Sequence, residues 1–211
     1  MARVQTDLEE VWNVITHGIG FLLFIGISIG LFTNADWSID YMLAALLVYC
    51  SSQLFLYVSS TSYHRAKEGV LKFKLRKLDH ISIYGSIAGT YTPVCLITLE
   101  SSSGWYILAA VWGVAIFGTI WKLFFTGKFE AFSSVLYLVM GWMIVFDLQT
   151  LSDAFTFLQM NLLISGGIFF TVGIVFYVWN KLYFNHVIWH LFVLGGSLSH
   201  AAMVWFVVSG V

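Results

Sequence analysis

The sequence predicts an all-α polytopic membrane protein with seven transmembrane helices, on the basis of its composition, its apolar segments and the placement of its charges. Of the 211 residues, 59% are hydrophobic and 10% are charged, whereas soluble domains carry about 25% charged residues. A soluble fold of this length has too small an interior for so much apolar surface. The net charge of −1 provides no positive field for nucleic acid. We therefore expect a single transmembrane domain over residues 1–211, with membrane lipid as its partner.

Seven apolar segments reach the length of about 20 residues that a transmembrane helix requires. The loops between them are short, so no second domain fits. Tryptophan and tyrosine residues near the segment ends are typical of an aromatic belt at the membrane surfaces. In chain order, the predicted spans are residues 14–33, 41–63, 80–99, 105–125, 132–151, 160–180 and 187–208.

Two segments carry signals about their local shape. Before the first span, apolar residues such as Leu8, Val11 and Trp12 recur at helical spacing. Residues 1–13 therefore predict a short amphipathic helix lying on the inner membrane surface. The third span contains Pro93, the single proline of the chain, which predicts a kink or a cavity beside that helix.

The lysines and arginines predict the direction in which the spans run. With the N-terminus in the cytoplasm, seven crossings place every basic residue at the cytoplasmic side, and an even number of crossings would not. These residues are Arg3, Arg65, Lys67, Lys72, Lys74, Arg76, Lys77, Lys122, Lys128 and Lys181. The outer segments contain Asp36, Asp40, Glu100, Asp147 and Asp153. By the positive-inside rule, the N-terminus is cytoplasmic and the C-terminus is outside, in a protein of the cell inner or plasma membrane.

Polar side chains that are costly at membrane depth gather at the predicted cytoplasmic ends of three spans. His64 ends the second span, Asp79 opens the third, and His186 and His190 open the last. Ser60 and His64 are one helical turn apart, as are His186 and His190, so each pair shares a helix face. Ionisable groups at such depth mark a candidate functional site.

The three histidines His64, His186 and His190 are candidate ligands of a metal ion. Two histidines a turn apart can bind one ion, and His64 lies at the depth required to supply the third ligand. Three histidines with one open position are a common zinc site, and imidazole also suits copper, iron and nickel. We expect Zn²⁺. The alternative is that each histidine is an interfacial polar residue with a hydrogen bond, and that Asp79 forms a solvated ion pair with a neighbouring basic residue.

Asp79 and Ser60 are the candidate catalytic residues beside this ion. Asp79 would act as a general base on a zinc-bound water, or would orient that water or a histidine. Ser60 would donate a hydrogen bond to the water or to a substrate oxygen. Zinc lowers the pKa of its bound water to about 7, which suits hydrolysis of an amide or ester of a membrane lipid.

Several sequence blocks resemble one known family. They are Glu10-x-x-Asn13-x-x-x-His17, Ser60-x-x-x-His64, Lys77-Leu78-Asp79-His80, Ala88-Gly89-Thr90-Tyr91-Thr92-Pro93 and Asn185-His186-Val187-Ile188-Trp189-His190. The pattern resembles the hemolysin III proteins, the bacterial branch of the superfamily that contains the progestin and adiponectin (adipoQ) receptors. The resemblance implies seven transmembrane helices with a cytoplasmic N-terminus. It also implies a zinc ion bound by His64, His186 and His190 beside Asp79 and Ser60, and ceramidase-like hydrolysis of lipid amides.

Three functions remain open at this point. The first is a zinc-dependent hydrolase of lipid amides, and the second is a cytolysin, as the family name suggests. The third is a receptor-like or membrane-homeostasis protein. In the last case, zinc only ties two helices together. His200 follows His190 by about 15 Å of helix and is not a predicted ligand. Glu10, Asn13, His17 and His80 are expected in the polar cluster without an assigned role.

Overall fold

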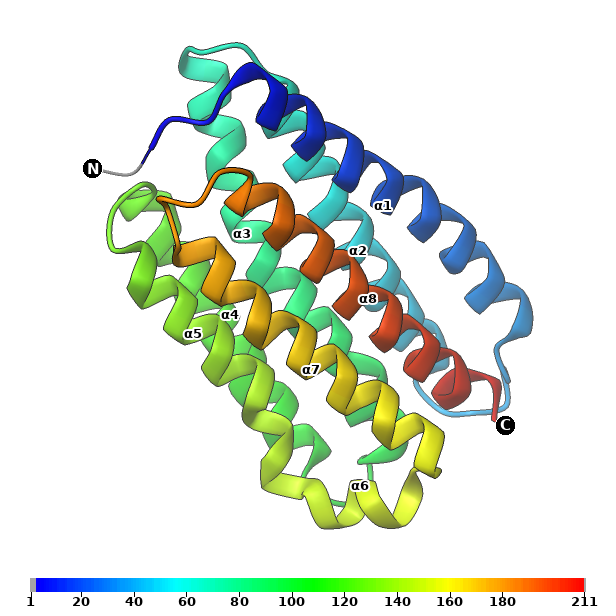
Figure 1. The fold of residues 1–211 in the computed structure, drawn as a ribbon. Helices are drawn as coiled ribbons and strands as arrows, with labels where there is room; N and C mark the ends of the chain where they lie inside the picture. Colours follow the sequence, from blue (N-terminus) through cyan, green and yellow to red (C-terminus); the bar gives the residue numbers. More distant parts are fainter. Residues whose placement is uncertain (1–2, 211) are drawn as a thin grey trace.

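Seven helical stretches long and apolar enough to cross a membrane make up the computed structural model, which describes residues 3–210 (Figure 1). All regular structure in that range is helical, which confirms the predicted fold class. In order, the elements are α1 (Asp7–Asn34), α2 (Met42–Arg65), α3 (Val70–Pro93), η1 (Val94–Thr98), α4 (Gly104–Phe125), α5 (Glu130–Trp142), η2 (Met143–Asp147), α6 (Leu148–Ala154), α7 (Phe157–Val178) and α8 (Asn185–Ser209). The third span joins α3 to η1, and the fifth joins α5, η2 and α6.

Residues 1–13 were predicted to form a separate amphipathic helix on the membrane surface. From Asp7 onward they are instead continuous with the first span. α1 begins at Asp7 behind a capping box formed by Thr6 and Glu9, and it continues without a break to Asn34. The segment contains no glycine or proline that would end a helix before the first span. Leu8 is exposed while Glu9 is buried, so the polar face of these first turns packs against the protein. Residues 1 and 2 of the predicted helix lie outside the described residues.

Pro93 distorts the third span, as the sequence predicted. α3 ends at Pro93, and the chain continues as the five-residue π-helix η1. Proline has no N–H to donate and its ring clashes with the carbonyl one turn earlier. Nearby, the Tyr91 hydroxyl donates to the Gly141 carbonyl and accepts from the Ile144 N–H, each at 2.9 Å. One tyrosine therefore links this distortion to the place where α5 passes into η2.

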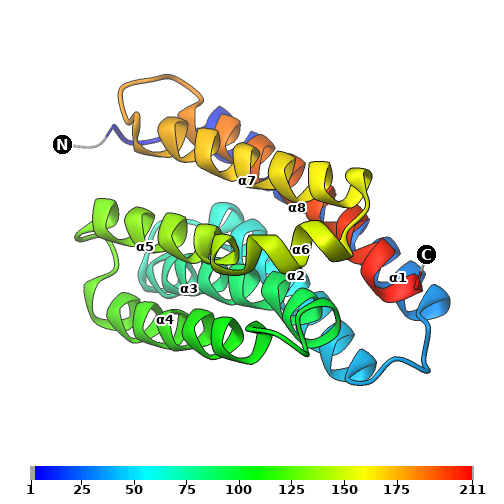
Figure 2. The same cartoon turned by 90° about the horizontal axis from the view of Figure 1, so that it is seen from below.

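α1 connects α2 and α8, the helices that carry His64, His186 and His190. α1 packs against both α2 and α8, whereas α2 and α8 make few contacts with each other. α7 packs along α8, and both lie on the side of α3 and α5 that faces away from α4 (Figure 2). Gly89 lets α2 and α3 approach closely, because a Cβ atom there would collide with the Ser52 side chain.

Positive charge is concentrated at one end of the bundle. This end contains the first described residues and the loops 66–69, 126–129 and 179–184, while the C-terminal residues and α6 lie at the other end (Figure 1). All lysines and arginines belong to segments at the first end, which we call the basic end. The odd number of spans thus separates the two termini, as the charge pattern requires.

We expect the basic end to face the cytoplasm, and two single cysteines test this orientation. Ser101 and Lys128 are exposed in loops at opposite ends. In a background with Cys50 and Cys95 replaced by alanine, S101C should react with a membrane-impermeant maleimide on intact cells, and K128C only after permeabilisation. The opposite labelling pattern would place the basic end outside.

Candidate metal centre

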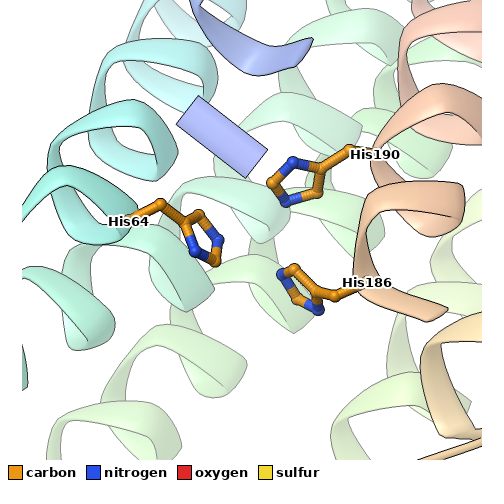
Figure 3. Close-up of side chains that lie close together, drawn as sticks. All are labelled: His64, His186 and His190. Carbon is orange, nitrogen blue, oxygen red and sulfur yellow. The ribbon is translucent and has the colours of Figure 1, made fainter. Parts of the chain in front are cut away.

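His64, His186 and His190 meet at the basic end of the bundle. His64 lies in the last turn of α2, and the other two lie in the first turns of α8. One ligand nitrogen from each ring lies within 4.8 Å of those of the other two. The ring centroids are 4.7–5.0 Å apart, and the rings surround one common space between α2 and α8 (Figure 3). The three candidate ligands predicted from spacing and depth are therefore brought together.

This donor set fits a zinc ion. Three nitrogens around a tetrahedral zinc lie roughly 3.3 Å apart, which small side-chain rotations reach from the observed spacing. The Nε2 atom of His64 is buried and has no hydrogen-bond partner within residues 3–210. A buried polar atom without a partner is costly, and coordination to a metal would satisfy it. Neutral imidazole nitrogens are also the ligands that zinc commonly takes.

Side chains of α1 contact the Nδ1 atoms of His64 and His190. The Nδ1 atom of His64 lies 2.5 Å from Oε2 of Glu10. The Nδ1 atom of His190 lies 3.2 Å from Oγ1 of Thr16. Sequence reasoning placed Glu10 near the site without a role and missed Thr16. Helical spacing from Glu10 through Asn13 to His17 is the signal that this face of α1 points inward.

Asp79 lines a cavity beside His186 and His190 and is 6% exposed. Within residues 3–210, its carboxylate forms no ion pair: Arg76 pairs with Glu130, and Lys77 donates to the Leu123 carbonyl. The solvated ion pair considered for Asp79 is therefore not what the fold provides. A buried carboxylate without a cationic partner is costly, which is typical of a group kept for function.

Ser60 lies one turn before His64 on α2 and is fully buried. Its Oγ atom has no hydrogen-bond partner among the described residues. The hydroxyl lies close to the Asp79 carboxylate, and it has the capacity to bond a ligand or a water in this region. Ser60 and His64 are not among the residues that line the cavity, whereas Asp79, His186 and His190 are.

The cavity extends from these residues into the bundle. The empty space among its lining residues is about 990 Å³, with the open space at its mouth included. Most of its walls are apolar side chains of α3, α5, α7 and α8, among them Ile83, Leu138, Phe170, Ile174 and Val193. One end of the cavity is therefore polar, while its walls suit a hydrocarbon chain.

Two further histidines lie near the site. His17 stacks on His190 with 3.5 Å between ring centroids, and in the described part of the chain neither of its ring nitrogens has a hydrogen-bond partner. His80 lines the cavity and faces Glu130, with 3.6 Å between Nδ1 and Oε2. His200 lies farther along the cavity, and its Nε2 atom is 3.1 Å from the Leu163 carbonyl oxygen.

An ion pair beside His80, between the buried Lys122 and the partly exposed Glu130, was not foreseen from the sequence. Lys122 is fully buried at the end of α4, and its Nζ atom donates to Oε2 of Glu130 at 2.5 Å. Tyr177 donates to the same oxygen at 3.4 Å. A buried lysine needs such a partner. Lys122 lies near the end of α4 and Glu130 begins α5. Because a loop separates these two helices, helical periodicity does not predict that the two residues pair.

Comparison with known proteins gives a consistent family assignment. The family described as "Haemolysin-III related" matches residues 6–201. Hemolysin-3 of Bacillus cereus is 44% identical over 201 residues, which cover 95% of this chain and 90% of that protein. A hemolysin-3 homolog of Bacillus subtilis is 40% identical over 195 residues, covering 92% of each chain. Heptahelical transmembrane protein 1 of Arabidopsis thaliana is 26% identical over 233 residues, covering 92% of this chain and 68% of that protein.

These similarities agree with the sequence blocks and with the seven helices of the fold. They cover nearly the whole described bundle, including α2 and most of α8. The chain is therefore a multi-pass membrane protein that belongs to the haemolysin-III family of the progestin and adiponectin receptor superfamily.

Proposed function

We propose that this protein is a zinc-dependent hydrolase of lipid amides that acts at the cytoplasmic side of the membrane. The observation that supports this most is the group of three histidines, two of which, His186 and His190, line the polar end of an apolar cavity. The three ligands leave a coordination position open, as catalytic zinc sites do. The cavity walls suit an acyl chain, and its polar end suits an amide headgroup.

The residues of this chain would divide the reaction between them. His64, His186 and His190 would hold zinc, which supplies an acidified water and polarises a carbonyl oxygen when bound. Asp79 would accept a proton from the attacking water and return it to the leaving amine nitrogen. Ser60, one turn before His64, would donate a hydrogen bond to the water or to a substrate oxygen. The products are a fatty acid and an amine, and water is the only co-reactant.

A non-catalytic role for the same zinc is the second candidate. α2 and α8 make few direct contacts, and the three histidines come from these two helices. An ion bound between them would add a link where the bundle has little packing. In that case the metal stabilises the fold, and the cavity only binds a lipid.

Turnover by purified protein separates the two roles. The zinc-loaded protein in detergent is offered ceramide, an N-acylethanolamine and a phospholipid ester, and released fatty acid is quantified. We expect release from an amide substrate that stops after removal of zinc by a chelator and returns when zinc is added. Bound zinc without turnover of any of the three lipids would favour the structural role. Leakage of liposomes to which the protein is added would instead favour the cytolytic role that the name of the Bacillus cereus relative suggests.

A further inference from the structure

We infer that α1 is the positioning element of the metal centre, because Glu10 and Thr16 fix the rings of His64 and His190 with their Nε2 atoms free for the ion. This inference rests on the proposed zinc site and adds two residues that act through its ligands. It also predicts that zinc binding and the docking of the first turns of α1 stabilise each other.

Glu10 fixes the tautomer of His64. A carboxylate only accepts hydrogen bonds, so at 2.5 Å from Oε2 of Glu10 the Nδ1 atom of His64 must carry the proton. The Nε2 atom then carries the lone pair, and it is the buried atom without a partner. A carboxylate that accepts from the outer nitrogen of a metal ligand also makes that ligand more basic.

Thr16 fixes His190 by a similar argument. The Thr16 hydroxyl has one proton, and two carbonyl oxygens of its own helix lie within reach of it, that of Trp12 at 2.9 Å and that of Asn13 at 3.1 Å. Its lone pairs remain to accept from Nδ1 of His190 at 3.2 Å. In this arrangement Nδ1 of His190 carries the proton and Nε2 is left unprotonated. Two ligands from different helices are thus set by one helix.

Lys72 holds Glu10 in this position. The Nζ atom of Lys72 donates to Oε1 of Glu10 at 2.7 Å, so the two carboxylate oxygens are shared between Lys72 and His64. The three residues come from α3, α1 and α2. Only 11% of the Lys72 side chain and 22% of the Glu10 side chain are exposed, so this pair is less screened than a surface salt bridge.

The neighbouring Glu9 anchors the same turn of α1 to the other side of the site. Oε1 of Glu9 accepts from the Phe184 N–H at 2.8 Å, directly before α8 begins. Glu9 and Glu10 therefore tie α1 to the two helices that carry the histidines. Since α2 and α8 have few contacts of their own, α1 sets their distance. By thermodynamic reciprocity, an ion that binds both helices stabilises the docked α1.

Zinc affinity of the detergent-purified full chain, measured by competition with a chromophoric chelator, tests this inference. We expect E10A to bind zinc about 10–100-fold more weakly, T16V to be weakened in the same direction, and E10Q to fall between E10A and wild type. Hydrogen exchange provides a second readout that does not depend on activity. Zinc should slow exchange of the amides of residues 11–17 in wild type, and should slow it less in E10A.

Two control variants match these changes. Glu68 also pairs with Lys72, at 3.4 Å, but its side chain is 90% exposed and the structure gives it no contact with His64. Thr33 donates to Ile29 with the same one-turn pattern as Thr16, but it is exposed near the other end of α1. E68Q and T33V should therefore keep zinc affinity within about twofold of wild type, as expected for surface changes.

The outcomes separate this inference from the proposed function. Wild-type affinity in T16V, which changes shape least and leaves Nδ1 of His190 without its acceptor, would overturn the positioning role even if E10A fails to fold, and would leave the zinc site intact. A wild-type protein that binds no zinc would overturn the metal centre itself, and the role of α1 with it. Equal weakening by E68Q would show that charge alone, rather than the contact with His64, is responsible.

Discussion

Replacement of His190 by alanine is expected to reduce the zinc content of the purified protein from about one ion per chain to less than about a tenth. His190 lies at the centre of the site, since it belongs to the three-histidine group and also stacks on His17. Without His190, only two protein ligands remain for zinc, which takes four ligands. H64A and H186A should have the same effect, because each removes one of the three nitrogens that share the space. Elemental analysis of protein purified in detergent measures the change.

His200 offers a matched control for this loss. It lies on the same helix as His190, but its Nε2 atom is 3.1 Å from the Leu163 carbonyl oxygen and it is outside the three-histidine group. H200A should therefore keep about one zinc per chain. Loss of zinc in H200A together with retention in H190A would contradict the assigned ligands.

Much of the fold and the proximity of the three candidate ligands were predictable because both depend on short-range patterns and on depth. The length of apolar segments predicts the spans, and the one-sided placement of basic residues predicts which ends lie together. A histidine pair one turn apart, as in His186 and His190, then shares a face whatever the neighbours are. Depth alone brings His64 to the same level.

The contacts that surround the ligands were not predictable in this way. Whether Glu10 reaches His64, or Thr16 reaches His190, depends on the rotation of α1 about its axis and on its distance from α2 and α8. Hydropathy reports neither quantity. Hydropathy also predicted the charged first turns of α1 as a separate surface helix and those of α3 as a loop, whereas both are continuous with the helices that follow. Lysine, arginine and glutamate are good helix formers, so a helix need not end where its apolar stretch ends.

Replacement of Asp79 by asparagine is expected to lower turnover of a lipid amide by about 10²–10⁴-fold, the usual contribution of a general acid–base group. Asparagine has nearly the same shape and remains neutral, so it fits the buried position, but its amide does not accept a proton at neutral pH. Zinc content should remain at the wild-type level, because Asp79 lies outside the three-histidine group. Turnover and zinc content are measured on the same preparation.

The comparison of these two readouts decides between the roles considered for Asp79. Lost turnover with retained zinc supports proton transfer at the substrate. Loss of both would show that Asp79 holds or orients the ion. Unchanged turnover would remove Asp79 from the mechanism, even though it lines the cavity beside two of the ligands. Asp153, which is exposed and accepts hydrogen bonds only from Gln149 in residues 3–210, provides the matched substitution, and D153N should change neither quantity.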